Sequence, residues 1–278
     1  MIVTTVRCTC HVSGCHTHSF QENQLVVAVL DTLMLFDSFL FMLVLSRMSS
    51  SAAALNSTCK TGALIFLHGL GDGPSGWSSL EQMLPSIKPR LSNLKYVFPP
   101  APIIPISING GERMPGWFDV LDWPIGLSAR DDKDGNLAAV AQIQKEVERL
   151  EKEGIARNRI VVGGFSQGGA IAILTAYRNE QEPLAGCAAL SGWLTLGDEL
   201  KISDNAKKTP LFWGHGQFDD KVLFEQQAHG VKLLEEQGVA VQAKSYPVGH
   251  SSHPDEMDAF ANFLDNLLYG DEEETKKE

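Results

Sequence analysis

The chain has 278 residues, 44% of them apolar, which is enough to bury the core of a single α/β domain. Its formal net charge of −11 argues against nucleic-acid binding, because phosphate contacts need Lys and Arg. Of the five cysteines, only Cys59 and Cys187 lie beyond the first fifteen residues. This distribution does not resemble a disulfide framework, and we expect a reducing, cytoplasmic compartment.

The first recognisable element is an apolar segment, residues 25–45, which is long enough to span a bilayer but contains two aspartates. Three interpretations remain open: a signal peptide cleaved near Ala54, a membrane anchor, or a true start at Met48. The third is favoured because the Ser- and Ala-rich run after Met48 resembles an ordinary N-terminus. Residues 1–58 are therefore expected to be a disordered extension or a mis-predicted start.

From residue 60 onward, short apolar runs alternate with longer amphipathic ones. The short runs predict buried strands at 63–67, 95–98, 159–162, 185–190, 211–213 and 239–246. Helical spacing of apolar residues predicts helices at 137–152, 170–177, 224–237 and 257–268. Asp134-Gly135 predicts a turn before the first of these helices. This alternation predicts a mostly parallel sheet with helices on both faces.

The segment 164–168 reads Gly-Phe-Ser-Gln-Gly and fits the Gly-x-Ser-x-Gly nucleophile elbow. It lies between a predicted strand and a predicted helix, which is the context that this motif requires. The turn is so tight that side chains at positions 164 and 168 would collide with neighbouring elements. The motif predicts Ser166 as a nucleophile. It also places the backbone N–H of Gln167 at a helix N-terminus, facing a developing oxyanion.

A second glycine-rich segment, residues 68–73, follows the first predicted strand. Its spacing does not fit the dinucleotide-binding pattern Gly-x-Gly-x-x-Gly, and no Gly-Lys-Ser/Thr follows it. The loop after an early strand supplies the other oxyanion donor in this type of site. We therefore expect the backbone N–H of Leu70 to be that donor.

In the nucleophile-elbow fold, the acid and then the histidine follow the serine along the chain. His250 is the favoured base because it lies in a loop between the last predicted strand and the last predicted helix. His253, three residues on, is the less favoured candidate. The acid should follow the strand 211–213, where Asp219 and Asp220 are adjacent. Chemistry alone does not separate these two aspartates.

Taken together, these motifs resemble the acyl-protein thioesterases, or phospholipase/carboxylesterase family, over about residues 63–267. The matching segments are FLHGLGD (66–72), PGWFD (115–119), RIVVGGFSQGGA (159–170), AALSGWL (188–194), His215-Gly216 with Asp219, and His250-Ser251-Ser252. The resemblance implies a triad of Ser166, Asp219 and His250 with backbone donors at Leu70 and Gln167. The chain departs from the family pattern near the acid, with Gln217 and Asp220 where an acid and a proline are frequent.

The resemblance also implies an α/β-hydrolase fold without a large cap domain, which we expect over residues 59–270, before an acidic tail at 271–278. It implies hydrolysis of long-chain acyl thioesters on S-acylated proteins, or of lysophospholipid esters, with no metal or cofactor. A short-chain carboxylesterase is the alternative. A non-catalytic binding protein of this fold would need a broken triad, and none is visible.

The irregular, proline-rich stretch 99–130 is longer than an ordinary loop between two elements, and loops of this length are usually functional. We expect it to line an acyl channel. We expect Trp117, Phe118 and Ile104 within it to bind substrate. The partners implied are S-acylated proteins or lysophospholipids, not nucleic acids, with transient contact at a membrane surface. The protein is expected to be a monomer or weak dimer.

Overall fold

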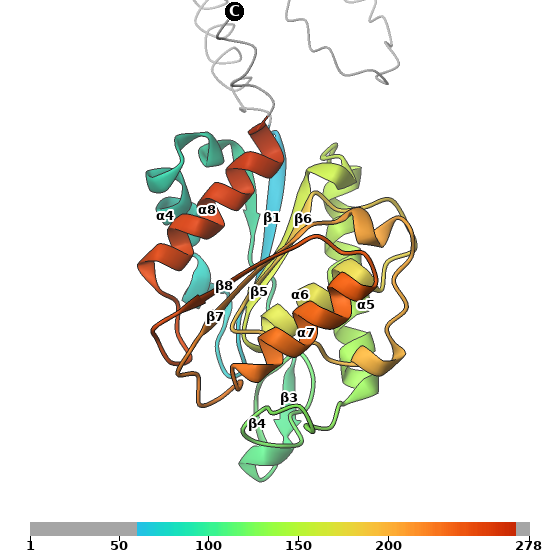
Figure 1. Ribbon diagram of the computed structural model, residues 1–278. Helices are drawn as coiled ribbons and strands as arrows, with labels where there is room; N and C mark the ends of the chain where they lie inside the picture. The colour runs from blue at the N-terminus through green and yellow to red at the C-terminus, as the bar shows by residue number, and fades with distance from the viewer. Residues whose placement is uncertain (1–59, 271–278) are drawn as a thin grey trace, which may run out of the picture. The chain divides into compact units, whose positions relative to one another are not determined.

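A computed structural model describes residues 60–270. A six-stranded parallel sheet lies at its centre, in the order β2-β1-β5-β6-β7-β8 (Figure 1). Its strands are β1 (Gly62–Leu67), β2 (Leu94–Val97), β5 (Ile160–Phe165), β6 (Gly186–Leu190), β7 (Leu211–Gly216) and β8 (Val241–Tyr246). The predicted parallel sheet is confirmed, and each predicted strand is found within a few residues of its expected bounds.

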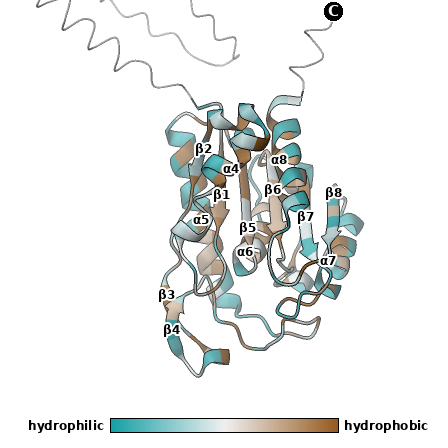
Figure 2. Ribbon diagram, turned by 90° about the vertical axis from the view of Figure 1, so that its left-hand side faces the viewer, coloured by the Kyte–Doolittle hydropathy of each residue, from teal (hydrophilic) through white to brown (hydrophobic). Residues whose placement is uncertain are grey.

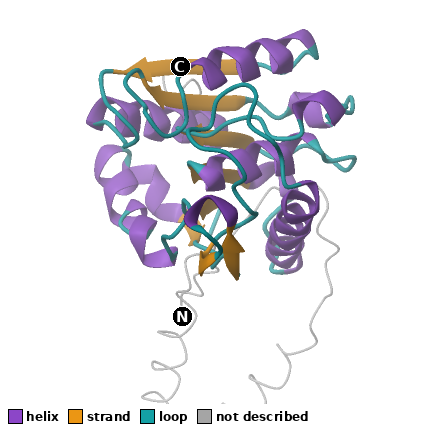
Figure 3. Ribbon diagram, turned by 90° about the horizontal axis from the view of Figure 1, so that it is seen from below, coloured by secondary structure: helices purple, strands orange, loops and turns teal. Residues whose placement is uncertain are grey.

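Helices cover both faces of this sheet, as Figures 1 and 3 show. One face carries α4 (Leu80–Ile87) and α8 (Pro254–Tyr269), and the other carries α5 (Lys133–Lys152), α6 (Gln167–Tyr177) and α7 (Glu225–Glu236). A single-turn helix, α3 (Pro74–Trp77), follows β1. Residues 60–270 contain no large cap domain over the sheet, so the predicted α/β-hydrolase architecture is confirmed for this part of the chain.

The residues of β1 show why its sequence is a continuous apolar run. Ile65 and Leu67 pack into the core beneath α5 and α6, whereas Leu64 and Phe66 pack into a second core beneath α4 and α8. A parallel strand buried on both faces needs apolar residues at every position. In Figure 2, β1 and β5 are accordingly hydrophobic, while the edge strand β8 is more polar.

The expected turn at Asp134-Gly135 is wrong, because both residues lie in the first turn of α5. Asp132 caps this helix, with its Oδ1 accepting a hydrogen bond from the Gly135 N–H at 3.0 Å. A glycine is needed there for close packing, since a Cβ at position 135 would lie 2.9 Å from the Cβ of Phe118. The Asp-Gly pair therefore marks a helix start.

The stretch expected to be irregular contains an antiparallel hairpin of β3 (Ile103–Ile106) and β4 (Glu112–Pro115). Its connection contains Gly110 and Gly111, both with positive φ. The prolines of this stretch argue against strands, and the sequence analysis therefore did not predict the hairpin. Proline is tolerated here because both strands of an isolated two-stranded ribbon have a free edge. The hairpin projects beyond the carboxyl ends of the sheet strands, the end at which Ser166 lies (Figure 1).

Within residues 60–270, no helix has the length and apolar character needed to cross a membrane. The apolar segment 25–45, the proposed start at Met48 and the acidic tail 271–278 lie outside the described residues.

Candidate active site

Ser166 forms the turn between β5 and α6. Its backbone angles, φ 55° and ψ −122°, are a conformation that residues with side chains rarely adopt. Two hydrogen bonds hold the turn: the Ser166 N–H donates to Leu190 O at 2.8 Å, and Ser166 O accepts from the Ala170 N–H at 3.1 Å. The strained turn is thus fixed from both β6 and α6.

The glycines on either side of Ser166 are required by close backbone approach. A Cβ at Gly164 would lie 2.3 Å from the carbonyl carbon of Gly168, and a Cβ at Gly168 would lie 2.3 Å from Leu67 O. These contacts are with backbone atoms, which cannot rotate away. Any larger residue at either position would force β1, β5 and α6 apart.

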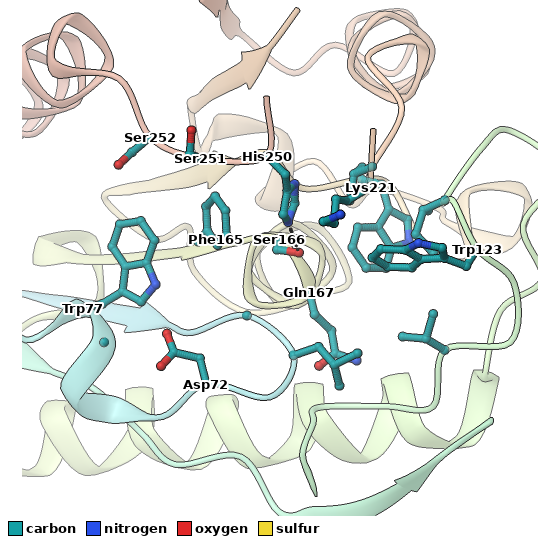
Figure 4. Close-up of a pocket in the computed structure, with 17 residues that line it drawn as sticks. Asp72, Trp77, Trp123, Phe165, Ser166, Gln167, Lys221, His250, Ser251 and Ser252 are labelled. Atoms are coloured by element: carbon teal, nitrogen blue, oxygen red, sulfur yellow. Dashed lines mark hydrogen bonds between the residues drawn. The ribbon is translucent and has the colours of Figure 1, made fainter. Parts of the chain in front are cut away.

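The structure brings Ser166, His250 and Asp219 into one hydrogen-bonded chain. His250 Nε2 lies 2.8 Å from Ser166 Oγ, and His250 Nδ1 lies 2.7 Å from Asp219 Oδ2. An ionised carboxylate can only accept, so Nδ1 carries the proton and Nε2 is free to accept the proton of the serine hydroxyl. Figure 4 shows the His250 ring directed at Ser166.

Asp219 is held as a carboxylate by the donors around it. Burial raises the pKa of Asp219, but hydrogen bonds from His250 and from the Lys221 and Val222 N–H groups outweigh this and leave the pKa below its ordinary value. Both N–H groups donate to Oδ1 at 2.9 Å. The side chain of the neighbouring Asp220 is 76% exposed and lies 3.6 Å from Lys221 Nζ. The contact to His250 is therefore made by Asp219.

The other downstream histidines have different surroundings. His253 caps α8, where its Nδ1 accepts from the Asp255 N–H. His215 is fully buried at the carboxyl end of β7, and burial lowers its pKa. Its Nε2 lies 2.9 Å from Val222 O and 3.4 Å from Asp219 Oδ2, so it supports the loop that carries Asp219. Sequence reasoning gave His215 no such role, although it directly precedes that loop.

The two expected oxyanion donors both belong to segments next to Ser166. Gln167 is the first residue of α6, and a first-turn N–H has no acceptor within its own helix. The loop after β1 passes close to Ser166, because a Cβ at Gly69 would lie 3.4 Å from the Ser166 Cβ. Leu70, the next residue, lines the pocket that opens at Ser166.

A pocket of about 490 Å³ opens at Ser166 and His250. In Figure 4, Asp72 and Trp77 lie to one side of Ser166, and Trp123 and Lys221 lie to the other. The pocket's apolar walls come from segments far apart in the chain: Leu70, Trp77, Val120, Trp123, Ile125, Phe165, Trp193 and Val222. Val120, Trp123 and Ile125 belong to the stretch 99–130, which was expected to line an acyl channel, but sequence reasoning named other residues of that stretch.

The three side chains expected to bind substrate are not in this pocket. Trp117 and Phe118 are 2% and 3% exposed, and together with Ile104 they line a separate cavity of about 320 Å³. The Gln167 side chain bonds to the Trp117 N–H at 2.8 Å and to Phe118 O at 2.7 Å. Trp117 and Phe118 therefore support the Ser166 turn through Gln167, and contact of these three residues with an acyl chain at Ser166 stays a prediction.

Comparison with known proteins agrees with this geometry. The chain is 40% identical to "Acyl-protein thioesterase 1" of Cryptococcus neoformans, over 75% of this chain and 93% of that one. It is 36% identical to the Saccharomyces cerevisiae protein of the same name, over 74% and 92%. Among solved structures, Arabidopsis thaliana SOBER1 is 31% identical with a TM-score of 0.70, covering 74% of this chain and 99% of that chain.

Zea mays acyl-protein thioesterase 2 is also similar in structure, with 33% identity and a TM-score of 0.65, over 75% of this chain and 94% of that one. A family model described as phospholipase/carboxylesterase matches residues 51–268. This match spans the whole sheet, the nucleophile turn and the loops that carry Asp219 and His250. The chain is therefore a member of the phospholipase/carboxylesterase family of α/β-hydrolases.

Proposed function

We propose that this protein is a serine hydrolase that removes long-chain acyl groups from S-acylated proteins, from lysophospholipid esters, or from both. The observation that carries the proposal is the hydrogen-bonded chain from Ser166 through His250 to Asp219, at the mouth of a pocket with apolar walls. The similarity to proteins named acyl-protein thioesterase supports the thioester as the scissile bond.

The geometry supports a two-step mechanism. Ser166 Oγ attacks the acyl carbonyl while His250 Nε2 removes the hydroxyl proton, and the N–H groups of Leu70 and Gln167 stabilise the oxyanion. His250 then protonates the departing thiolate or alkoxide, leaving an acyl-enzyme on Ser166. Water attacks this ester with His250 again as base, which releases the fatty acid and restores the serine. Asp219 stabilises the imidazolium formed in both steps.

The pocket suggests where the acyl chain lies. Val120, Ile125 and Val222 contribute apolar surface near the nucleophile, and the Ile125 N–H and Lys221 O are joined by a 2.8 Å hydrogen bond that fixes this wall. On the side of Ser166 away from Trp123 and Lys221, Asp72 and the serines of the His250 loop add polar groups beside Trp77 (Figure 4). We infer that the acyl chain occupies the first side and the leaving group the second.

The test measures kcat/KM of the full-length protein on substrates of increasing acyl length. These are acetyl, butyryl, octanoyl and palmitoyl thioesters and the matching oxygen esters. Burial of each methylene contributes about 0.8 kcal/mol. We therefore expect kcat/KM to rise up to about fourfold per methylene until the pocket is filled. A maximum at acetyl or butyryl esters would contradict the long-chain assignment and support the short-chain carboxylesterase. Absence of turnover on every substrate would overturn the hydrolase proposal itself.

Replacing Asp219 with Asn is expected to lower kcat by about 10⁴-fold while leaving the fold intact. The amide would present N–H donors to His250 Nδ1 and favour the tautomer with a proton on Nε2, which cannot accept from Ser166. Ester hydrolysis by the purified variant measures this effect. Asp220→Asn is the matched control: this exposed neighbour makes no contact with His250, so its activity should equal wild type. Equal losses in the two variants would contradict the assignment.

Transient contact with a membrane surface is also proposed, on the basis of two exposed aromatic residues. Trp123, which is 49% exposed, borders the pocket, and Phe218, 69% exposed, lies directly before Asp219. Exposed aromatic side chains partition favourably into a membrane interface. The cytoplasmic location and the monomeric or weakly dimeric state stay predictions from the sequence.

A further inference from the structure

His68, the residue before the oxyanion loop, has a buried imidazole with both ring nitrogens engaged. The side chain is 1% exposed. Its Nδ1 lies 2.8 Å from Gly69 O, and its Nε2 lies 3.2 Å from the backbone nitrogen of Ala101. The mechanism above gives this histidine no role, and it does not line the pocket at Ser166.

The two partners define which nitrogen of His68 carries the proton. The Gly69 carbonyl can only accept, so Nδ1 must be protonated, and the Ala101 N–H can only donate, so Nε2 must be unprotonated. Trp117 adds a further restraint, because its Nε1–H donates to His68 O at 2.8 Å and its ring packs against the imidazole. The imidazole is therefore fixed as a donor to the Gly69 carbonyl.

The Gly69 carbonyl belongs to the same peptide unit as the Leu70 N–H. In a trans peptide the C=O and N–H point in opposite directions. Holding Gly69 O towards His68 therefore turns the Leu70 N–H the other way. Gly69 lies against Ser166, and Leu70 lines the pocket where the oxyanion would form.

The other oxyanion donor is held by an equivalent arrangement. The Gln167 N–H shares its peptide unit with Ser166 O, which accepts from the Ala170 N–H within the first turn of α6. A helix thus anchors one donor peptide, whereas the Leu70 peptide lies in a loop, where Gly69 O has only a longer backbone bond from Asp72, at 3.3 Å. The His68 imidazole supplies the stronger anchor that the loop lacks.

We propose that His68 is a positioning residue for the oxyanion hole, which directs the Leu70 N–H by holding the Gly69 carbonyl with its Nδ1–H. The inference rests on the proposed hydrolase function, and it concerns transition-state stabilisation, not substrate binding. Loss of the anchor should therefore lower kcat and leave KM nearly unchanged.

Two substitutions separate positioning from simple structural support. His68→Gln keeps an acceptor near the Ala101 N–H but loses the donor to Gly69 O. His68→Asn places an amide donor near the position of Nδ1 and loses the Ala101 acceptor. Each removes one buried hydrogen bond, and Asn is smaller than Gln by one methylene, so a purely structural role predicts losses of thermal stability and activity at least as large in His68→Asn as in His68→Gln.

We expect His68→Gln to lower kcat by about 10- to 100-fold, less than complete loss of an oxyanion donor. Its affinity for a trifluoromethyl ketone, which forms a tetrahedral adduct with the serine, should fall by the same factor. The pH profile should keep its shape because His250 is untouched, and His68→Asn should recover most of the loss. A folded His68→Gln variant with wild-type kcat, or equal losses of kcat in both variants, would overturn the proposal.

A second measurement does not depend on turnover. Nitrogen-15 NMR of the histidine-labelled full chain reports which nitrogen of His68 is protonated, with His68→Asn used to assign the signal. Protonated Nδ1 supports the positioning role, and protonated Nε2 overturns it even if the protein hydrolyses esters. Wild-type protein that hydrolyses no ester refutes the proposed function separately, and the protonated nitrogen still decides the orientation of the Gly69 carbonyl.

Discussion

Replacing Ser166 with Ala is expected to lower kcat for ester hydrolysis by about a millionfold, because the covalent route through an acyl-enzyme is lost. The oxyanion donors and the pocket remain, so binding of substrate should persist with little change in KM. Ala has the same Cβ as Ser and meets the same strain at φ 55°, so stability should be close to wild type. Steady-state kinetics, thermal unfolding and labelling by a fluorophosphonate probe together measure these effects.

Ser191 offers a matched control for this experiment. Like Ser166 it has a positive φ, 48°, and it follows β6 as Ser166 follows β5, but its side chain is buried. It does not line the pocket, so Ser191→Ala should keep both turnover and fluorophosphonate labelling. Labelling that survives in Ser166→Ala would show that a different residue is the nucleophile.

The nucleophile turn could be predicted from sequence because its causes are local. The strand, the tight turn and the helix follow one another within residues 159–177, and each requires particular residue types. The structure gives the physical reason for the two glycines, since a Cβ at Gly164 or Gly168 would meet backbone atoms at 2.3 Å. The order serine, acid, histidine along the chain of a nucleophile-elbow fold then favoured His250, after the last strand.

The choice between Asp219 and Asp220 could not be made from local chemistry. Both are carboxylates in one loop, and the loop conformation decides which of them reaches His250. The Lys221 and Val222 N–H groups turn back onto Asp219 Oδ1, and this leaves Asp220 in solvent. Only the resemblance to known proteins favoured Asp219 beforehand.

The individual residues of the pocket walls were missed for a related reason. Ile125 and Val222 form an isolated parallel bridge between segments nearly a hundred residues apart, and no periodicity in the sequence predicts such a pairing. Aromatic residues such as Trp117 were assigned to the substrate because they lie in a long loop. Their burial shows that a loop of this length builds its own packed layer, here against Gln167.

Replacing His250 with Ala is expected to lower kcat about as far as Ser166→Ala does, by roughly 10⁵- to 10⁶-fold. Without the imidazole, Ser166 has no base, since His215 is buried and bonded to Val222 O. Serine and base act as one unit, so the double variant Ser166→Ala/His250→Ala should be no slower than either single variant. Kinetics of all three proteins and fluorophosphonate labelling of His250→Ala, expected to be much reduced, test this prediction.

His253→Ala is the control for this prediction, because His253 lies in the same loop and was the rival base. Its side chain caps α8 through the Asp255 N–H, and the loss of such a cap costs about 1 kcal/mol of stability. We expect a lower melting temperature with near wild-type kcat, because His253 makes no hydrogen bond to Ser166 or Asp219. If His253→Ala loses as much turnover as His250→Ala while its fold stays intact, His253 and not His250 is the general base. Retained turnover would show that the loop can lose its helix cap and still present the His250 imidazole to Ser166.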